Sequence, residues 1–290
     1  MINVLRFFTE FLITLLVIIF VSCLPLFGQT LRISEFMRAF ISSFQYLFNP
    51  GALQIPQYYG EELAFFNIIG EKYFNTMIIL ITSFLIAIIL SLVVSFLYIK
   101  SNEKIKRTFS SFFFVLESVP DVLMVIILQF SFVMVYKFSG WSLGITAITN
   151  DGSLYLLPII CLSVIPTIQL FKYFSSYVEE EQKKTYSEFL KAKGLSENYI
   201  IVFHLFKNSL IQFISQSKNI ILFMLSNLLI LELVLNIDGL MGFIKTYGIG
   251  DHRILMWCLI LIYLPFLLFY KSIHLITEHR TSNGGSRNGA

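Results

Sequence analysis

The chain has 290 residues, of which 56% are hydrophobic and only 13% are charged. A soluble domain would carry about a quarter charged residues, so the mean hydropathy of +0.76 indicates that a lipid bilayer is the main solvent. The net charge of +3 is small and scattered, which argues against a nucleic-acid partner.

Six apolar segments are long enough to cross a membrane as helices, which takes about 20 residues each. An unpaired backbone N–H or C=O is costly in lipid, so a helix is the expected structure for such runs. The sequence therefore predicts an all-α, polytopic membrane protein with six transmembrane helices. The predicted spans are 8–27, 76–99, 110–136, 154–176, 209–235 and 254–276.

Lysine and arginine set the expected orientation, because these residues concentrate in cytoplasmic loops. If the N-terminus is cytoplasmic, 14 of the 21 Lys and Arg residues fall on the cytoplasmic side and 6 fall outside. Both termini are therefore expected in the cytoplasm.

The N-terminal region, residues 1–74, is expected to hold the first span and a long external loop. The run RFFTEFLITLLVIIFVSC could pass for a signal peptide. However, Glu10 lies where a basic segment should lead into the apolar core, and further spans follow, so we expect a retained helix. Apolar residues recur at three- and four-residue spacing over 33–48, which predicts an amphipathic helix. It would either lie in the outer membrane interface or cover an external opening.

The segment 178–208 is charged and joins the fourth and fifth spans on the cytoplasmic side. From about Glu179 to Lys193 the pattern is helical, and Gly194 is placed to end that helix in a left-handed conformation. Ser196 can then cap a second helix. Exposed apolar side chains at this corner would be typical of a partner site, although two helix ends resting on the inner leaflet explain the pattern equally well. These side chains are Tyr186, Phe189, Leu190, Leu195 and Tyr199.

The string EFLKAKG, residues 188–194, resembles the EAA loop of ATP-binding cassette importer permeases, in which Glu-Ala-Ala is followed three residues later by Gly. Glu188 and Gly194 match, while Phe189 and Leu190 replace the two alanines. The wider string YSEFLKAKGLSENYIIVFHLFKNSL is similar to the oligopeptide, dipeptide and nickel permeases, with their AKGLSE core and H-x-x-[RK]-N tail. The tail residues here are His204, Lys207 and Asn208.

Two other stretches are similar to the same family, so that the resemblance runs in order over about 75–275. ESVPDVLMVIILQFSF contains the Ser-x-Pro that opens the family's third span. LELVLNIDGLMG resembles the ET-I-F-x-x-x-G-L-G element that follows the fifth, with Asp238 where the family usually has Pro. The residues that match this element are Glu232, Gly239, Leu240 and Gly242.

The resemblance implies an ABC importer permease fold, with a five-helix core over 75–276 and a polar cytoplasmic tail over 277–290. It implies that the loop 178–208 is a coupling helix seated in a groove of a cytoplasmic ATPase. The implied partners are two ATPase subunits, a second permease and an extracytoplasmic solute-binding protein, in the bacterial inner membrane. The implied coupling residues are Tyr186, Glu188, Phe189, Leu190, Ala192, Lys193, Gly194, Leu195, Ser196 and Glu197.

The sequence has no GxxxxGK[ST] phosphate-binding loop and no Ser/His/Asp, Cys/His or HExxH arrangement. We therefore expect no enzyme activity and no bound cofactor, with ATP on the partner ATPases. The three cysteines lack CxxC spacing and indicate neither disulfides nor zinc. His252, His274 and His279 are not clustered, so no metal site is expected.

Ionisable residues in predicted spans are candidates for function, because charges are costly in lipid, and four are singled out. They are Glu117, Asp121, Lys218 and Glu232. In a single third helix bent at Pro120, Glu117 and Asp121 would share a face. Glu117 and Lys218 lie at matched depths in their spans, which predicts an ion pair between two helices. Alternatively, Lys218 reaches the inner surface while Glu117 faces water. The four residues either form a polar seam or line the translocation path.

The favoured function is therefore one permease half of an ATP-driven peptide importer. Nickel, or a metal bound to a chelator, is the alternative cargo, because no residue in the sequence chooses between them. A stand-alone secondary transporter or channel would be expected to show internal repeats, and none is evident. A membrane scaffold or sensor is the third alternative, although no soluble sensory domain is evident.

Overall fold

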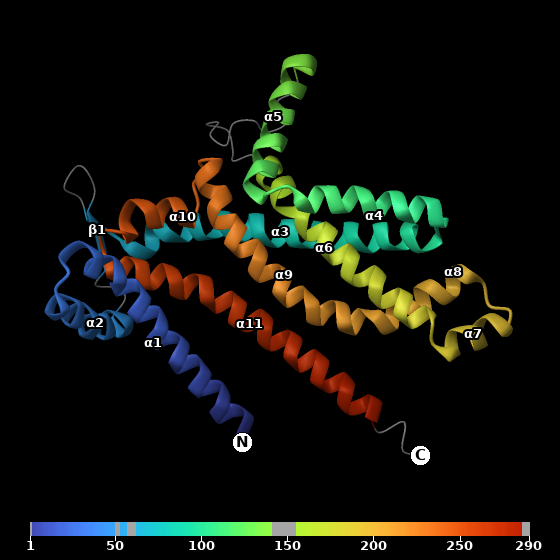
Figure 1. Cartoon of the computed structure of the whole chain (residues 1–290). Coiled ribbons are helices and arrows are strands. Elements are labelled where there is room, and N and C mark those ends of the chain that lie inside the picture. Colours follow the sequence, from blue (N-terminus) through green and yellow to red (C-terminus); the bar gives the residue numbers. More distant parts are fainter. Residues whose placement is uncertain (1, 50–52, 57–61, 141–154, 286–290) are drawn as a thin grey trace. The chain divides into compact units, whose positions relative to one another are not determined.

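The computed structural model describes residues 2–49, 53–56, 62–140 and 155–285, and these are almost entirely helical (Figure 1). The prediction of an all-α protein with six spans is confirmed. The departure from it is a short antiparallel hairpin of β1 (Gln54–Pro56) and β2 (Glu62–Ala64), which the sequence did not suggest. Six helical segments are long and apolar enough to cross a membrane: Phe8–Gly28, Phe65–Lys100, Asp121–Ser139, Leu156–Gln182, Glu197–Val234 and His252–Ser272.

The chain divides into two compact units. The first contains residues 1–77 and 236–269, and the second contains residues 78–235 and 270–290. Two long helices, α3 (Phe65–Lys100) and α11 (His252–Gly285), run from one unit into the other. The other helices of the first unit are α1 (Ile2–Thr30), α2 (Ile33–Phe48), α10 (Leu240–Phe243) and the π-helix η3 (Ile244–Gly248).

The core of the first unit forms where α1, α2 and α11 pack together. Ile19 and Met256 are fully buried in it, and Phe40 and Phe44 of α2 pack against this cluster. The amphipathic spacing over 33–48 therefore predicted helix α2 correctly. Only part of its apolar side packs on this core, since Ile33, Met37, Ile41 and Phe48 are exposed.

The turn between α9 and α10 is held by one face of α3, in the first unit. Lys72 forms an ion pair with Asp238, and the Asn75 amide donates to the Asp238 carbonyl oxygen at 2.9 Å. One turn further along α3, the Thr76 hydroxyl accepts the Leu240 N–H at 2.9 Å. Asp238, which departs from the resembled pattern, is thus accommodated by a lysine on the neighbouring helix.

The second unit is built around α6, which is buried along most of its length against α9. The ring of Phe174 lies between those of Phe206 and Phe213, with centroids 4.7 and 5.0 Å away. On another side, the Ser175 hydroxyl donates to Ser95 of α3 at 3.2 Å. The remaining elements are α4 (Glu103–Ser118), α5 (Asp121–Ser139), α6 (Leu156–Gln182), α7 (Thr185–Ala192), α8 (Glu197–Tyr199), the π-helix η2 (Ile200–Phe206) and α9 (Lys207–Val234).

The predicted third span, 110–136, is wrong as a single helix. Helix α4 ends at Ser118, Val119 and Pro120 have ψ angles of 127° and 140°, and α5 begins at Asp121. A residue before proline is pushed out of the α conformation, so the chain breaks here instead of bending. Consequently Glu117 and Asp121 belong to separate helices and do not share a helical face.

Candidate functional site

The corner between the fourth and fifth spans, which the sequence predicts to be cytoplasmic and which we call the cytoplasmic corner, consists of the end of α6, then α7, α8 and η2. It lies at one end of the second unit (Figure 1). The single helix expected over 179–193 is wrong, because α6 ends at Gln182 and α7 begins only at Thr185. Gly194 has φ of +78°, as predicted, and its N–H donates to the Lys191 carbonyl at 2.9 Å. This left-handed residue reverses the chain after α7.

The second helix of the corner is longer than the sequence suggested. Ser196 is extended and precedes α8, but its hydroxyl makes no capping hydrogen bond. Helical structure continues from Glu197 through η2 and α9 to Val234. The corner is therefore joined directly to a membrane span by one continuous helical segment.

A buried carboxylate ties α7 to the spans on either side of it. Glu181, at the end of α6, is 6% exposed and accepts the Tyr186 hydroxyl at 2.6 Å. Asn208, at the start of α9, donates to Glu181 at 3.4 Å and to the Tyr186 hydroxyl at 3.1 Å. Lys184 also forms an ion pair with Glu181. Burial and the hydrogen bond to Glu181 raise the pKa of Tyr186 to about 12.

Four large apolar side chains of the corner are exposed, namely Phe189, Leu195, Tyr199 and Phe203, and we call this set the aromatic patch. The side chains of Phe189 and Phe203 are 57% and 59% exposed. The rings of Tyr199 and Phe203 stack with centroids 4.8 Å apart. Exposed rings held together in this way are typical of a surface that a partner protein covers.

The structure separates the predicted coupling residues into two groups. Tyr186 and Leu190 are half-buried, and the Tyr186 hydroxyl bonds inward to Glu181. The exposed group consists of Glu188, Phe189, Ala192, Lys193, Gly194, Leu195, Ser196 and Glu197.

The expected ion pair between Glu117 and Lys218 is wrong. Glu117 pairs with Lys172 of α6, because α4 packs against that helix. The Lys218 ammonium lies 4.5 Å from the centroid of the Tyr270 ring. Of the other predicted charges, Glu232 is buried in α9, and Asp121 lies at a cavity beside the break at Pro120.

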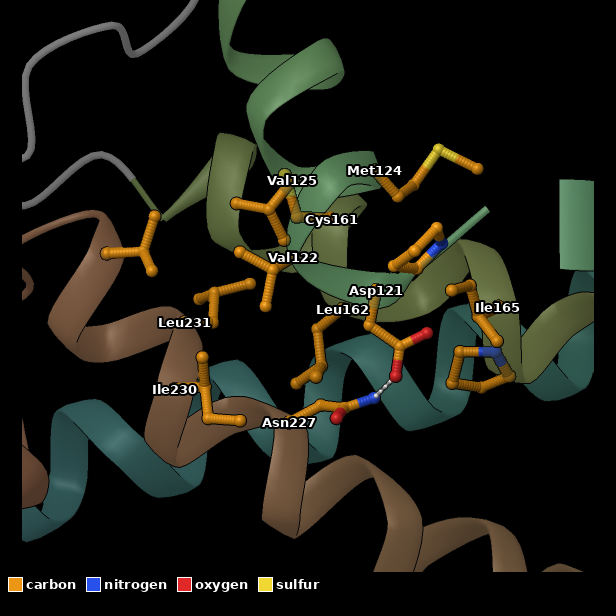
Figure 2. Close-up of a pocket in the computed structure, with 13 residues that line it drawn as sticks. Asp121, Val122, Met124, Val125, Cys161, Leu162, Ile165, Asn227, Ile230 and Leu231 are labelled. Atoms are coloured by element: carbon orange, nitrogen blue, oxygen red, sulfur yellow. Dashed lines mark hydrogen bonds between the residues drawn. The ribbon is translucent and has the colours of Figure 1, made fainter. Parts of the chain in front are cut away.

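This cavity has a volume of about 280 Å³ and lies between the start of α5, the middle of α6 and the end of α9 (Figure 2). Its walls are mostly apolar, and Asp121 is its carboxylate. Asn227 of α9 donates its side-chain amide to that carboxylate at 2.8 Å, as the dashed line in Figure 2 shows. The described residues that line it are Pro120, Asp121, Val122, Met124, Val125, Cys161, Leu162, Ile165, Pro166, Asn227, Ile230, Leu231 and Val234.

Sequence reasoning missed three residues that organise these sites. Glu181 is one of three consecutive glutamates, and only helical spacing from the buried Phe174 and Val178 marks it as the inward one. Asn227 is a lone amide in an apolar run, and Lys172 was treated as a loop charge. Their partners come from other helices, so no local pattern could have revealed them.

Residues 83–283, more than half of the chain, match the family of binding-protein-dependent transport system inner membrane components. The chain belongs to this family. It is a multi-pass inner-membrane permease subunit of an ABC importer, and it is not itself the catalyst, since the ATPase is a separate subunit. A binding-protein-dependent importer also implies a solute-binding protein as a partner.

The fold is similar to that in a crystal structure of an amino acid ABC transporter with histidines. The two chains are 12% identical with a TM-score of 0.56, over 73% of this chain and 94% of the other. No curated protein matches this chain. At this identity the similarity extends to the fold alone, so the resemblance to peptide and nickel permeases stays a prediction.

Proposed function

We propose that this permease forms half of a peptide-import path and is driven through the cytoplasmic corner. The observation that carries the proposal is the aromatic patch at the tip of that corner. Its four side chains belong to the segment that resembles the EAA loop or directly follow it. Apolar rings in this position are suited to a groove on a cytoplasmic ATPase, which would remove them from water.

The buried network behind the patch supports the same proposal. Glu181 of α6, Tyr186 of α7 and Asn208 of α9 are hydrogen-bonded together, so α7 is fastened to two spans at once. A force that the ATPase exerts on the patch would therefore act on both α6 and α9. The full assembly would contain two ATPase subunits, which bind ATP, a second permease and an external solute-binding protein.

Peptide is the proposed cargo because the stretch around Gly194 is similar to the oligopeptide, dipeptide and nickel permeases. The expected assay result is uptake of a labelled tripeptide into proteoliposomes that contain the complete transporter. Uptake should require both ATP inside and the binding protein outside. Uptake of Ni²⁺ without uptake of any peptide would replace peptide by the alternative cargo.

The coupling role has a matched test in two exposed phenylalanines of the second unit. Phe189→Ala, in the patch, should reduce both co-purification of the ATPases and ATP hydrolysis stimulated by the binding protein. Phe138→Ala, at the far end of α5 and 88% exposed, removes the same ring away from the corner. Equal ATPase binding by both variants would reject the patch as the coupling surface.

A further inference from the structure

The cavity at the Pro120 break has the composition of a small ligand site. Such sites are usually concave and apolar, with a few polar groups that orient the ligand. Here the walls come from α5, α6 and α9, with Val125, Leu162 and Ile230 among the apolar residues (Figure 2). The polar side chains of the wall are those of Asp121 and Asn227, which are hydrogen-bonded to each other.

The cavity offers acceptors for a hydrogen-bond donor. The Asp121 carboxylate is one acceptor. The side-chain carbonyl oxygen of Asn227 is a second, because the hydrogen bond to Asp121 uses the amide nitrogen of Asn227. A third lies on α6, where Pro166 has no N–H to give to the Leu162 carbonyl four residues earlier. Leu162 and Pro166 both line the cavity.

The charge balance of the cavity also favours a cation. None of the described residues lining it is Lys, Arg or His. Asp121, the first residue of α5, supplies the carboxylate of the wall. Lys172 of α6 interacts with Glu117, and Lys218 of α9 interacts with Tyr270. In a medium of low dielectric, this carboxylate attracts a cation and repels an anion.

Size limits the ligand further. A volume of about 280 Å³ equals roughly nine water molecules at about 30 Å³ each. That space accommodates one residue and not a whole oligopeptide. An ammonium group has three N–H donors for the acceptors described above. We propose that this cavity binds the N-terminal ammonium group and first side chain of a peptide in transit.

This inference rests on the proposed peptide cargo, and the first test uses the complete reconstituted transporter. Two tripeptides, Leu-Ala-Ala and its N-acetylated form, differ at the N-terminus, where an acetylated amide replaces the ammonium group. Wild type should prefer the free peptide, and Asp121→Asn should reduce the ratio of the two kcat/KM values about tenfold or more, as expected for loss of a charged hydrogen bond. The binding protein is the same in each assay, so a change in ratio belongs to the permease.

Two variants control for indirect effects of the substitution. Asp121→Glu keeps the carboxylate and should retain most of the preference for the free peptide. Glu103→Gln removes an acid from the first turn of α4, where its side chain is 82% exposed, and should leave the ratio unchanged. An unchanged ratio in Asp121→Asn, with peptide uptake intact, would overturn the inference and leave the proposed function standing.

A second test does not depend on transport. It measures the rate at which thiol reagents modify Cys161, which lies in the cavity wall. With Cys23 and Cys258 replaced by alanine, aminoethyl methanethiosulfonate should modify Cys161 faster than the anionic sulfonatoethyl reagent. Leucinamide, which carries the ammonium but no carboxylate, should slow the reaction, and Asp121→Asn should abolish both effects. These results in a transporter that moves no peptide would support a cation site while rejecting the peptide cargo.

Two outcomes of the cysteine test count against the site. Equal rates with both reagents would show that Asp121 does not select charge there. Modification of Cys161 at the same rate with and without leucinamide would show that an ammonium ligand does not occupy the cavity.

Discussion

The cytoplasmic corner and the Pro120 break are both interruptions between helices, but they are held in different ways. At the corner, three side chains from α6, α7 and α9 converge with Lys184, and the central carboxylate of Glu181 is buried. At the break, among the residues that the structure describes, the Glu117 side chain pairs with Lys172 of α6 and the Asp121 side chain accepts from Asn227 of α9.

This difference in hydrogen bonding should make the two regions resist rearrangement to different degrees. A network with several shared hydrogen bonds resists rearrangement, because each bond limits the movement of the others. The break instead has a cavity beside it, and the backbone at Val119 and Pro120 is extended. We therefore expect substitutions at the corner to cost more stability than substitutions at the break.

The largest expected effect follows from removing the central acid of the corner. Glu181→Leu leaves Tyr186 and Asn208 without their shared acceptor and should lower the free energy of unfolding by about 3 kcal/mol. Thermal unfolding of the transporter in lipid nanodiscs measures this loss, and stimulated ATP hydrolysis should fall with it. Glu180→Leu is the matched control, because Glu180 is exposed. Equal losses in both variants would contradict the special role of Glu181.

The second effect comes from the left-handed residue that ends α7. A Cβ built on Gly194 has no atom within 4 Å, so a substitution there is penalised only by its φ of +78°. Gly194→Val should cost about 1–2 kcal/mol and uncouple ATP hydrolysis, whereas Gly194→Asn should cost much less because Asn tolerates this conformation. The ATPase activity of the two variants measures the difference. Equal activity of Val and Asn would mean that the turn is not needed for coupling.

The sequence predicted those parts of the structure that depend on local composition. Hydropathy located the spans, apolar spacing located α2, and Gly194 marked the end of the coupling helix. The hairpin of β1 and β2 was missed, since two strands of three residues leave almost no periodic signal. Pro120 correctly marked a disturbance in the third span, but the expected bend was wrong, because the helix breaks there.

The partners of the buried charges could not be predicted, because they depend on which helices pack together. Glu117 and Lys218 were predicted to pair because they lie at the same depth in their spans. Equal depth does not fix the direction in which each side chain points. The packing of α4 on α6 selects Lys172 instead. The same limit hid Asn227, which acquires a role only when α9 lies beside the start of α5.

A smaller effect, with a defined pH dependence, is expected at Tyr186. Tyr186→Phe removes one hydrogen bond to a carboxylate and should cost about 1–2 kcal/mol at neutral pH. The folded pKa of about 12 lies above the ordinary value of 10, so this contribution is complete below pH 10 and declines as pH rises to 12. Unfolding of wild type and variant across this range should therefore converge. A constant difference would show that the hydroxyl does not titrate as described.

The smallest effect is expected at the break, where the ion pair between Glu117 and Lys172 has side chains that are 29% and 40% exposed. Partly exposed pairs contribute at most about 1 kcal/mol, because solvent screens them and ordering long side chains costs entropy. A double-mutant cycle of Glu117→Gln with Lys172→Gln, followed by unfolding, measures the coupling directly. The parallel cycle of Glu117→Gln with Lys218→Gln should show no coupling, because Lys218 lies over Tyr270. A coupling of about 2 kcal/mol or more for Lys172 would make the break as firmly held as the corner, and a coupling to Lys218 would restore the pair expected from depth alone.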